Sequence, residues 1–262
     1  MNVTLSITDL LQIARAAALE AGAVIMQVYT SGAFDVSMKL DDSPLTKADR
    51  AAHEVISRDL AISGLPILSE EGQHHPYELR QQWEWYWLVD PLDGTKEFLK
   101  RNGEFTVNIA LMHQNKPVAG LIYAPVPGSL YFGSAATGVY KEENGVKTQL
   151  LPLPKRYALE ELLQKPELTI VASRTHLSPK TEEFIRRFPE ASTSSMGSSL
   201  KFMLLAEGKA DLYPRFAPTM EWDTAAAHAL LNALNRGIYQ ADLQQELTYN
   251  KEDLYNPDFI AF

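Results

Sequence analysis

The sequence contains no cysteine. A disulfide scaffold, a thiolate zinc site, an iron–sulfur cluster and a cysteine nucleophile are therefore excluded together. Basic residues are also in the minority: 24 Lys and Arg stand against 33 Asp and Glu, which gives a formal net charge of −9. This excess of acid argues against a protein that grips nucleic acid through a broad basic face, so we expect no nucleic-acid partner.

The sequence also lacks an uninterrupted hydrophobic run. Its longest apolar stretch, residues 13–28, is broken by Arg15 and Glu20. The first residues of the sequence lack the positive region and the cleavage site of a signal peptide. We therefore expect no membrane span and a cytoplasmic protein. With 262 residues, 45% of them hydrophobic and 22% charged, the composition is typical of a globular protein with one large or two modest domains.

The first half of the chain predicts two helices followed by a series of short strands. Helical spacing of apolar residues covers residues 8–29, which Thr8 and Asp9 would cap, and residues 47–62. Strand-like runs follow at 67–69, 85–89, 105–112, 118–124, 130–133 and 139–141. Turn signals such as Asn144-Gly145 separate these runs closely, which favours antiparallel hairpins.

The pattern changes after the proline-containing stretch 150–166. Strands at 168–172 and 210–213 alternate with helices at 179–187, 198–207 and 223–234. We therefore predict a mixed α/β protein of two domains. Residues 1–155 would form an α+β domain with an antiparallel sheet, and residues 156–262 a smaller α/β domain.

Five acidic residues stand where predicted elements begin or end: Glu70, Glu71, Asp90, Asp93 and Asp223. Asp90 follows an apolar strand, and Asp93 lies in the turn that comes next. Two carboxylates held so close repel each other unless a cation lies between them, and Mg²⁺ is the hard divalent ion that oxygen ligands suit best. A helix beginning near Thr95 would aim free backbone N–H groups at the same point, which suits a phosphate.

Four of these acids also have a purely structural interpretation. Asp93-Gly94 is a common turn former, Asp223 would by default cap a helix, and Glu70-Glu71 would by default be solvated. Their joint placement at the ends of elements favours a divalent-metal site that handles phosphate.

Four sequence blocks resemble the lithium-sensitive, Mg²⁺-dependent phosphomonoesterases that include inositol monophosphatase. The blocks are TKAD at residues 46–49, LSEEG at 68–72, WLVDPLDGTKEF at 87–98 and WDTAA at 222–226. The resemblance runs from about residue 5 to 235. It implies a layered αβαβα sandwich of two domains, of the sugar-phosphatase type, with the site in the cleft between them.

Within this family the sequence is similar to the bacterial 3′(2′),5′-bisphosphate nucleotidases, on residues 96–110, 197–202 and 212–216. That similarity implies hydrolysis of the 3′-phosphate of adenosine 3′,5′-bisphosphate to AMP and phosphate, with 3′-phosphoadenylyl sulfate as a further substrate, in sulfur assimilation. Two alternatives stay open: an inositol or sugar monophosphatase, which would share the metal-binding blocks, and a non-catalytic nucleotide sensor. Because some members of the family associate with the inner membrane, the resemblance also implies peripheral association with that membrane.

The resemblance implies a set of metal ligands. Glu70, Asp90 and the backbone carbonyl of Leu92 would hold one Mg²⁺. Asp90, Asp93 and Asp223 would hold a second, and a third ion would bind more loosely near Glu70. The ions would activate a water and neutralise the phosphoryl oxygens and the leaving 3′-oxygen.

By the same resemblance, Asp49 bonded to Thr95 would accept the proton of the attacking water. Asp49, Glu70 and Thr95 thus form the expected catalytic set, with Glu71 steadying the site through water.

Two groups of residues are expected to contact the substrate. Leu92, Asp93, Gly94, Thr95 and Asp223 would surround the reacting phosphate. The rest of the nucleotide, including its 5′-phosphate, would meet His176, Gly197, Ser198, Ser199, Lys201 and Arg215. Backbone N–H groups at residues 197–199 suit an anion at a helix start, although such a turn is also an ordinary helix cap and single basic residues are commonly just solvated.

Overall fold

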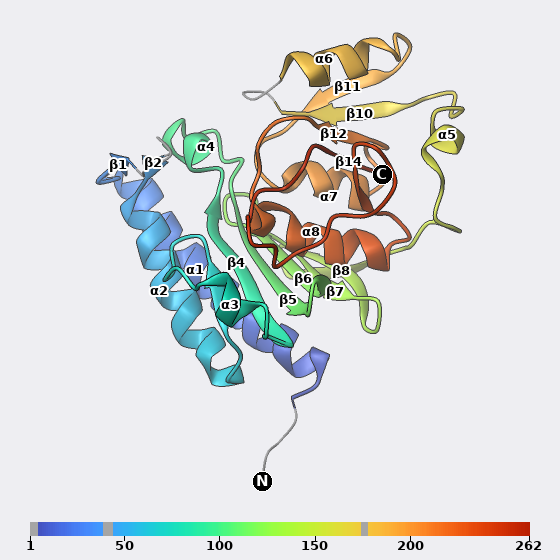
Figure 1. The fold of residues 1–262 in the computed structure, drawn as a ribbon. Coiled ribbons are helices and arrows are strands. Elements are labelled where there is room, and N and C mark those ends of the chain that lie inside the picture. Colours follow the sequence, from blue (N-terminus) through green and yellow to red (C-terminus); the bar gives the residue numbers. More distant parts are fainter. Residues whose placement is uncertain (1–4, 39–43, 174–177) are drawn as a thin grey trace.

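The structure is a computed structural model that describes residues 5–38, 44–173 and 178–262 (Figure 1). Its helices are α1 (Ile7–Ser31), α2 (Lys47–Leu60), the 3₁₀ helix η1 (Ala61–Ser63), α3 (Tyr77–Arg80), α4 (Thr95–Leu99), α5 (Leu159–Leu162), α6 (Pro179–Arg186), α7 (Leu200–Ala206) and α8 (Glu221–Ala233). Its strands are β1 (Ser37–Met38), β2 (Pro44–Leu45), β3 (Ile67–Ser69), β4 (Trp85–Asp93), β5 (Thr106–His113), β6 (Lys116–Ala124), β7 (Ser129–Ser134), β8 (Gly138–Glu143), β9 (Val146–Leu150), β10 (Thr169–Ala172), β11 (Ser192–Ser195), β12 (Tyr213–Arg215), β13 (Ile238–Gln240) and β14 (Phe259–Ala261).

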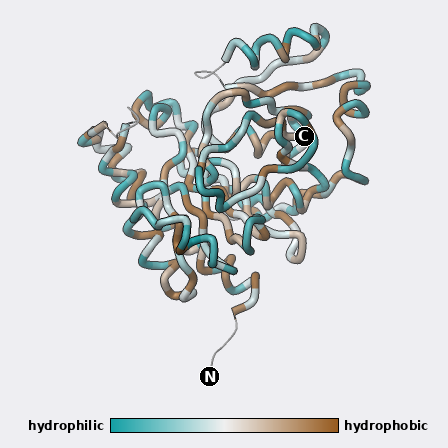
Figure 2. Tube along the Cα trace, viewed as in Figure 1, coloured by the Kyte–Doolittle hydropathy of each residue, from teal (hydrophilic) through white to brown (hydrophobic). Residues whose placement is uncertain are grey.

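These elements form successive layers, which Figure 1 shows from α1 and α2 at the left to α6 at the top. A seven-stranded sheet follows α1 and α2, then come α7 and α8, then the strands of the second half, and finally α6. Figure 2 shows hydrophilic and hydrophobic residues alternating along α2 and α6, as helices with one buried face require. The layers confirm the mixed α/β sandwich expected from the sequence.

The large sheet has the strand order β3-β4-β5-β6-β7-β8-β9. Strands β4 to β9 pair as antiparallel neighbours, as the closely spaced turn signals predicted. β3 instead pairs with β4 in parallel, because the chain between them crosses over through residues 70–84, which include α3. The sequence patterns did not predict β9, whose residues 146–149 are exposed at the sheet edge and show no buried face.

Helix α1 packs its small residues against α2 and the sheet. Ser6 caps the helix: its hydroxyl accepts the N–H of Asp9 at 3.2 Å, and the Asp9 carboxylate accepts the N–H of Ser6 at 3.0 Å. Of the predicted caps, Asp9 does take part in capping, through the N–H of Ser6, whereas Thr8 is not the N-cap, because the helix begins one residue earlier at Ile7. By length and composition α1 could cross a membrane, but 44% of its most apolar window is buried, and Ala17 and Ala21 lie in the core.

Helix α8 covers the opposite face of the sheet. Tyr86 and Leu88 of β4 share one apolar core with residues 225–227 of α8, whereas Trp87 and Val89 face the core beneath α1 and α2. A Cβ atom built on Gly120 of β6 would lie 2.1 Å from the backbone oxygen of Ala226. The backbone of α8 therefore packs directly on β6, which fixes the position of the helix against the sheet.

The second half of the chain adds two smaller sheets. β10 and β11 pair in parallel, and β12, β14 and β13 form an antiparallel sheet. The strand predicted at 210–213 is displaced to Tyr213–Arg215, where it pairs with Phe259–Ala261. The large sheet ends at residue 150, but α8 shares a core with it, so the division into domains 1–155 and 156–262 stays a prediction.

The close approach of α8 to β6 makes a testable prediction. Gly120→Ala should lower the free energy of unfolding by about 2–3 kcal/mol, because the added methyl group meets backbone that no side-chain rotation can move. Gly145→Ala is the matched control: its φ of +77° is costly for alanine, about 1 kcal/mol, but nothing lies within 4 Å. Calorimetric melting of both variants compares the two costs, and equal losses would contradict the direct packing of α8 on β6.

Candidate active site

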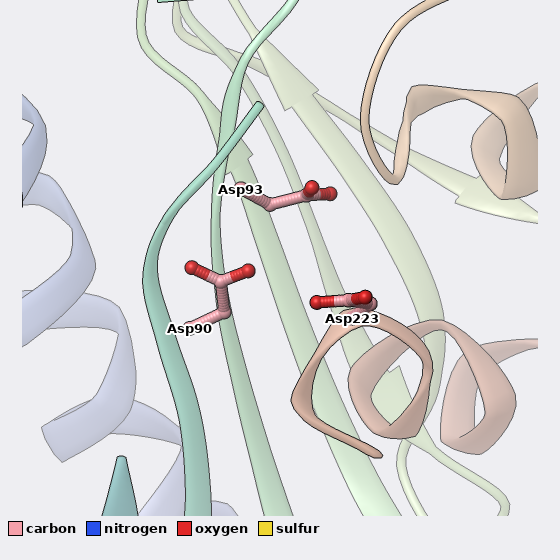
Figure 3. A group of neighbouring side chains, drawn as sticks. All are labelled: Asp90, Asp93 and Asp223. Atoms are coloured by element: carbon pink, nitrogen blue, oxygen red, sulfur yellow. The ribbon is translucent and has the colours of Figure 1, made fainter. Parts of the chain in front are cut away.

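Three aspartates meet where β4 ends and α8 begins. Figure 3 shows the carboxylates of Asp90, Asp93 and Asp223 directed toward one shared space. One oxygen from each lies within 4.8 Å of the others. Asp90 is buried, and the other two are half-buried beside a pocket between the two halves of the chain. The structure thus brings together three of the acids expected to bind metal.

A β-bulge explains why Asp90 and Asp93 point the same way. Side chains three residues apart on a regular strand face opposite sides of the sheet. Here Asp90 pairs with Asn108 and Asp93 pairs with Thr106, so three steps along β4 match only two along β5. The extra residue turns Asp93 onto the face that carries Asp90, which is the face covered by α8.

Asp223 reaches the same space from the first turn of α8. Its carboxylate accepts the N–H of Met220 at 2.8 Å, which satisfies one of the free donors at the helix start. Asp223 is the third residue of α8 and not its N-cap, but its side chain does help to cap the helix through this bond.

The local environment disfavours charge on these acids. Burial raises the pKa of Asp90 well above its ordinary 3.8, and the charges of Glu70, Asp93 and Asp223 raise it further. Burial also raises the pKa of Asp223, with added repulsion from Asp93 and Glu70. The pKa of Asp93 is raised by burial as well, although Lys201 and hydrogen bonds from Ser199 act in the opposite direction. A cation among these oxygens would relieve the repulsion.

Glu70 lies beside this group but outside the set of three whose oxygens converge. It follows β3, and its N–H donates to the carbonyl of Val89 at 3.1 Å, which holds it next to the end of β4. Its charge acts on both Asp90 and Asp223. Glu71 comes next and is half-buried. The metal role of Glu70 and the supporting role of Glu71 stay predictions.

Asp49 and Thr95 form the expected pair. The Thr95 hydroxyl donates to Oδ1 of Asp49 at 3.1 Å, and the carbonyl of Leu92 lies 3.4 Å from the same hydroxyl. The other carboxylate oxygen of Asp49, Oδ2, accepts the N–H of Thr46 at 2.8 Å and its hydroxyl at 2.5 Å. Asp49 is therefore held as the third residue of α2, with Oδ1 directed at Thr95.

The turn at residues 197–199 differs from the expectation. The N–H of Gly197 donates to the carboxylate of Glu104 at 2.8 Å, and the N–H of Ser199 donates to Oδ2 of Asp93 at 2.6 Å. Two of the donors expected for a phosphate therefore already have carboxylate partners. Ser198 between them has a φ of 43° and lines the pocket.

The pocket between the halves also contains the basic residues named from the sequence. Lys201 is 5% exposed, and its ammonium donates to the carbonyl of Ser198 at 2.6 Å. Burial lowers the pKa of Lys201 to about 8, while Asp93 favours its charged form. Arg215 of β12 lines the same pocket, as do Gly94 and Thr95. His176, the remaining candidate, lies outside the described residues.

Sequence reasoning missed Asn108 and Thr106 on β5. The amide of Asn108 lies 3.4 Å from Asp93 and donates to the hydroxyl of Ser199 at 2.9 Å, and Thr106 donates to Oδ1 of Asn108 at 2.9 Å. The signal was present, because Asn108 is the lone strongly polar residue in the run VNIALM. A buried amide in a central strand needs hydrogen-bond partners, and here they include an acid of the site.

A hard divalent cation fits the donors that converge here. The three aspartates supply carboxylate oxygens only, and the sequence has no thiolate to favour a softer metal. The raised pKa values show that the described protein groups leave the acids under-neutralised. The arrangement can therefore hold a metal next to a pocket that also contains basic side chains.

Comparisons with known proteins agree with this geometry. The sequence profile of the inositol monophosphatase family matches residues 6–258. The 3′(2′),5′-bisphosphate nucleotidase CysQ of Salmonella typhimurium strain LT2 is 48% identical over 248 residues, covering 92% of this chain and 95% of that protein. The CysQ of Haemophilus influenzae is 35% identical over 93% of this chain and 88% of that protein.

Solved structures show the same fold. The crystal structure of CysQ from Bacteroides thetaiotaomicron, described as a bacterial member of the inositol monophosphatase family, superposes with a TM-score of 0.81 at 46% identity and 95% coverage of both chains. The extragenic suppressor protein SuhB of Bartonella henselae, at 24% identity, reaches a TM-score of 0.73 over 96% of this chain and 92% of that one, which supports the fold alone. Sequence profile, relatives and fold agree, and this chain belongs to the inositol monophosphatase family.

Proposed function

We propose that this protein is a Mg²⁺-dependent 3′(2′),5′-bisphosphate nucleotidase that hydrolyses adenosine 3′,5′-bisphosphate to AMP and phosphate. One observation carries the proposal: the converging acids Asp90, Asp93 and Asp223 lie beside the Asp49–Thr95 pair in a chain 48% identical to a CysQ nucleotidase. 3′-Phosphoadenylyl sulfate is a second proposed substrate, which would place the enzyme in sulfur assimilation.

Two groups of ligands are proposed for the metal. Glu70, Asp90 and the Leu92 carbonyl would hold one ion, and Asp90, Asp93 and Asp223 a second, with a third ion near Glu70. When bound, the ions would supply charge neutralisation for the phosphoryl group and the leaving oxygen. Support comes from the shared space among the aspartates and from the raised pKa of each of them. Inhibition by Li⁺ is proposed on the family resemblance.

In the proposed reaction the oxygen of a water molecule bonds to phosphorus and the bond from phosphorus to the 3′-oxygen breaks. The water proton passes to Oγ of Thr95, and the Thr95 proton passes to Oδ1 of Asp49, which already accepts it as a hydrogen bond. Thr46 donates to Oδ2 of Asp49, whereas Oδ1 accepts the Thr95 hydroxyl and is the oxygen that would take its proton. The leaving 3′-oxygen takes up a proton from water.

The basic side chains of the pocket would bind the second phosphate of the substrate. Lys201 and Arg215 line the same pocket as Asp93 and Asp223, and both come from the second half of the chain. Charge-assisted hydrogen bonds from these side chains suit the 5′-phosphate. Because the N–H groups of Gly197 and Ser199 have carboxylate partners, the contribution proposed for the 197–199 turn comes from Ser198.

An inositol or sugar monophosphatase is the competing function, because the family profile matches residues 6–258 and so covers the acids of both β4 and α8. A nucleotide sensor would bind the same ligand without releasing phosphate. The cytoplasmic location and the peripheral membrane association stay predictions.

Steady-state assays separate these functions. We expect adenosine 3′,5′-bisphosphate to be the preferred substrate, with kcat/KM for 3′-AMP about 10–100-fold lower, because hydrogen bonds between charged groups are worth about 1.5–3 kcal/mol. Inositol 1-phosphate, which also lacks the second phosphate, should be poorer still. A higher kcat/KM for inositol 1-phosphate would contradict the proposal, and nucleotide binding without phosphate release would favour the sensor.

The metal ligands make a second prediction. Asp93→Asn should lower kcat by more than about 100-fold, since even residues that only orient a metal ligand cost about 10–100-fold. The fold should survive, because asparagine keeps an oxygen to accept the N–H of Ser199. The substitution also removes a negative charge that burial disfavours, as the raised pKa of Asp93 indicates. Asp242→Asn, an exposed acid outside the pocket, is the control. Turnover of the Asp93 variant at the wild-type rate would mean that the metal binds elsewhere.

Protons and metal should compete for the aspartates. A carboxyl group whose pKa is raised in the folded protein binds more protons there than when unfolded, so metal-free stability falls as pH rises from about 4 through the raised pKa values. Mg²⁺ replaces those protons, so its stabilising effect should be larger at pH 7.5 than at pH 5. Melting temperatures with and without Mg²⁺ at both pH values measure this difference, and an equal shift at both would argue against these aspartates as ligands.

A further inference from the structure

Ser199 lies buried between the two elements that carry the aspartates. It is 1% exposed and stands just before α7, in contact with β4, β5 and α8 at once. Its backbone N–H donates to Oδ2 of Asp93 at 2.6 Å. Its hydroxyl donates to the backbone carbonyl of Asp223 at 3.0 Å. Ser199 therefore bonds both to the side chain of Asp93 on the sheet and to the backbone of Asp223 on the helix.

Asn108 fixes the direction of this bridge. Its Nδ2 donates to the Ser199 hydroxyl at 2.9 Å, while its Oδ1 accepts the hydroxyl of Thr106 at 2.9 Å. An amide nitrogen only donates and a carbonyl only accepts, so the single proton of the Ser199 hydroxyl has to go to Asp223. The result is a directional chain of hydrogen bonds from β5 through Ser199 to the first turn of α8.

We propose that Ser199, oriented by Asn108, is a positioning residue that sets the separation of Asp93 and Asp223 before a cation binds. The inference rests on the proposed metal-dependent function. The like charges of Asp93 and Asp223 repel each other in this buried site. The packing of Gly120 against α8 does not act at Asp223, because it contacts the helix three residues further along, at Ala226. The Ser199 bridge acts at Asp223 itself, so it opposes that separation where the ligand is carried.

This role is distinct from simple stabilisation. A buried hydrogen bond contributes about 1 kcal/mol to folding wherever it lies, so its loss lowers stability in any case. Positioning predicts in addition a selective loss of metal affinity, because partners that orient metal ligands change affinity without touching the ion. Metal binding in the absence of nucleotide is the measurement that separates the two roles.

The test uses Mn²⁺ as a spectroscopic probe of the full chain without nucleotide. Electron paramagnetic resonance of free Mn²⁺ gives its dissociation constant for wild type, Ser199→Ala, Asn108→Ala and the double variant. Ser134→Ala is the control, because Ser134 is also 1% exposed and hydrogen-bonded, to Thr137, but lies in β7 outside the site. We expect Ser199→Ala to weaken Mn²⁺ binding about tenfold and Ser134→Ala to leave it unchanged.

The variants of Asn108 and Ser199 also give outcomes that would overturn the inference. Asn108→Ala removes the donor that orients the Ser199 hydroxyl together with the Asn108 contact to Asp93, so the double variant should lose less affinity than the sum of the two single losses. Wild-type Mn²⁺ affinity in Ser199→Ala, or an equal loss in Ser134→Ala, would overturn the positioning role. If Ser199→Ala fails to fold, Asn108→Ala removes the donor that orients Ser199 together with its contact to Asp93, and wild-type Mn²⁺ affinity in that variant would overturn the inference. Wild-type protein that binds Mn²⁺ but does not hydrolyse the nucleotide would refute the proposed function and leave this inference standing, whereas no Mn²⁺ binding would overturn both.

Discussion

Repulsion among Asp90, Asp93 and Asp223 is the constraint on which the site depends, because the fold holds three carboxylates together where burial and their mutual charge disfavour ionisation. Burial and mutual charge raise the pKa of Asp90 and Asp223 well above the ordinary value. Such a cluster lowers the stability of the metal-free protein, and a divalent ion that binds there relieves the repulsion and therefore binds more tightly. The same repulsion among the aspartates therefore lowers the stability of the metal-free protein and raises its affinity for metal.

The scaffold withstands this repulsion by attaching each acid to a rigid element. The bulge in β4 turns Asp93 onto the face of Asp90, and the direct packing of α8 on Gly120 fixes the helix that carries Asp223. Ser199 then joins the two parts with one backbone and one side-chain hydrogen bond. Residues far apart in the sequence are thus held at short range by packing as well as by hydrogen bonds, before any ion contributes.

Much of this arrangement could be predicted from the sequence. The acids at element ends and the hairpins of the large sheet produce local signals, and the helix at Thr95 begins where the Asp-Gly turn indicates, although it is only five residues long. The bulge could not be read locally, because it depends on which residues of β5 lie opposite β4. The carboxylate partner of Gly197 lies 93 residues away, so its N–H was wrongly taken as free. The exposed edge strand β9 has no buried face to reveal it.

The most direct test of the metal-site account is a crystal structure grown with Mn²⁺ and adenosine 3′,5′-bisphosphate, with anomalous scattering used to locate the metal. The account predicts an anomalous peak coordinated by oxygens of Asp90, Asp93 and Asp223, with the 3′-phosphate against it and the 5′-phosphate toward Lys201. An ordered nucleotide with no metal among these oxygens, or a metal bound only by other residues, would contradict it.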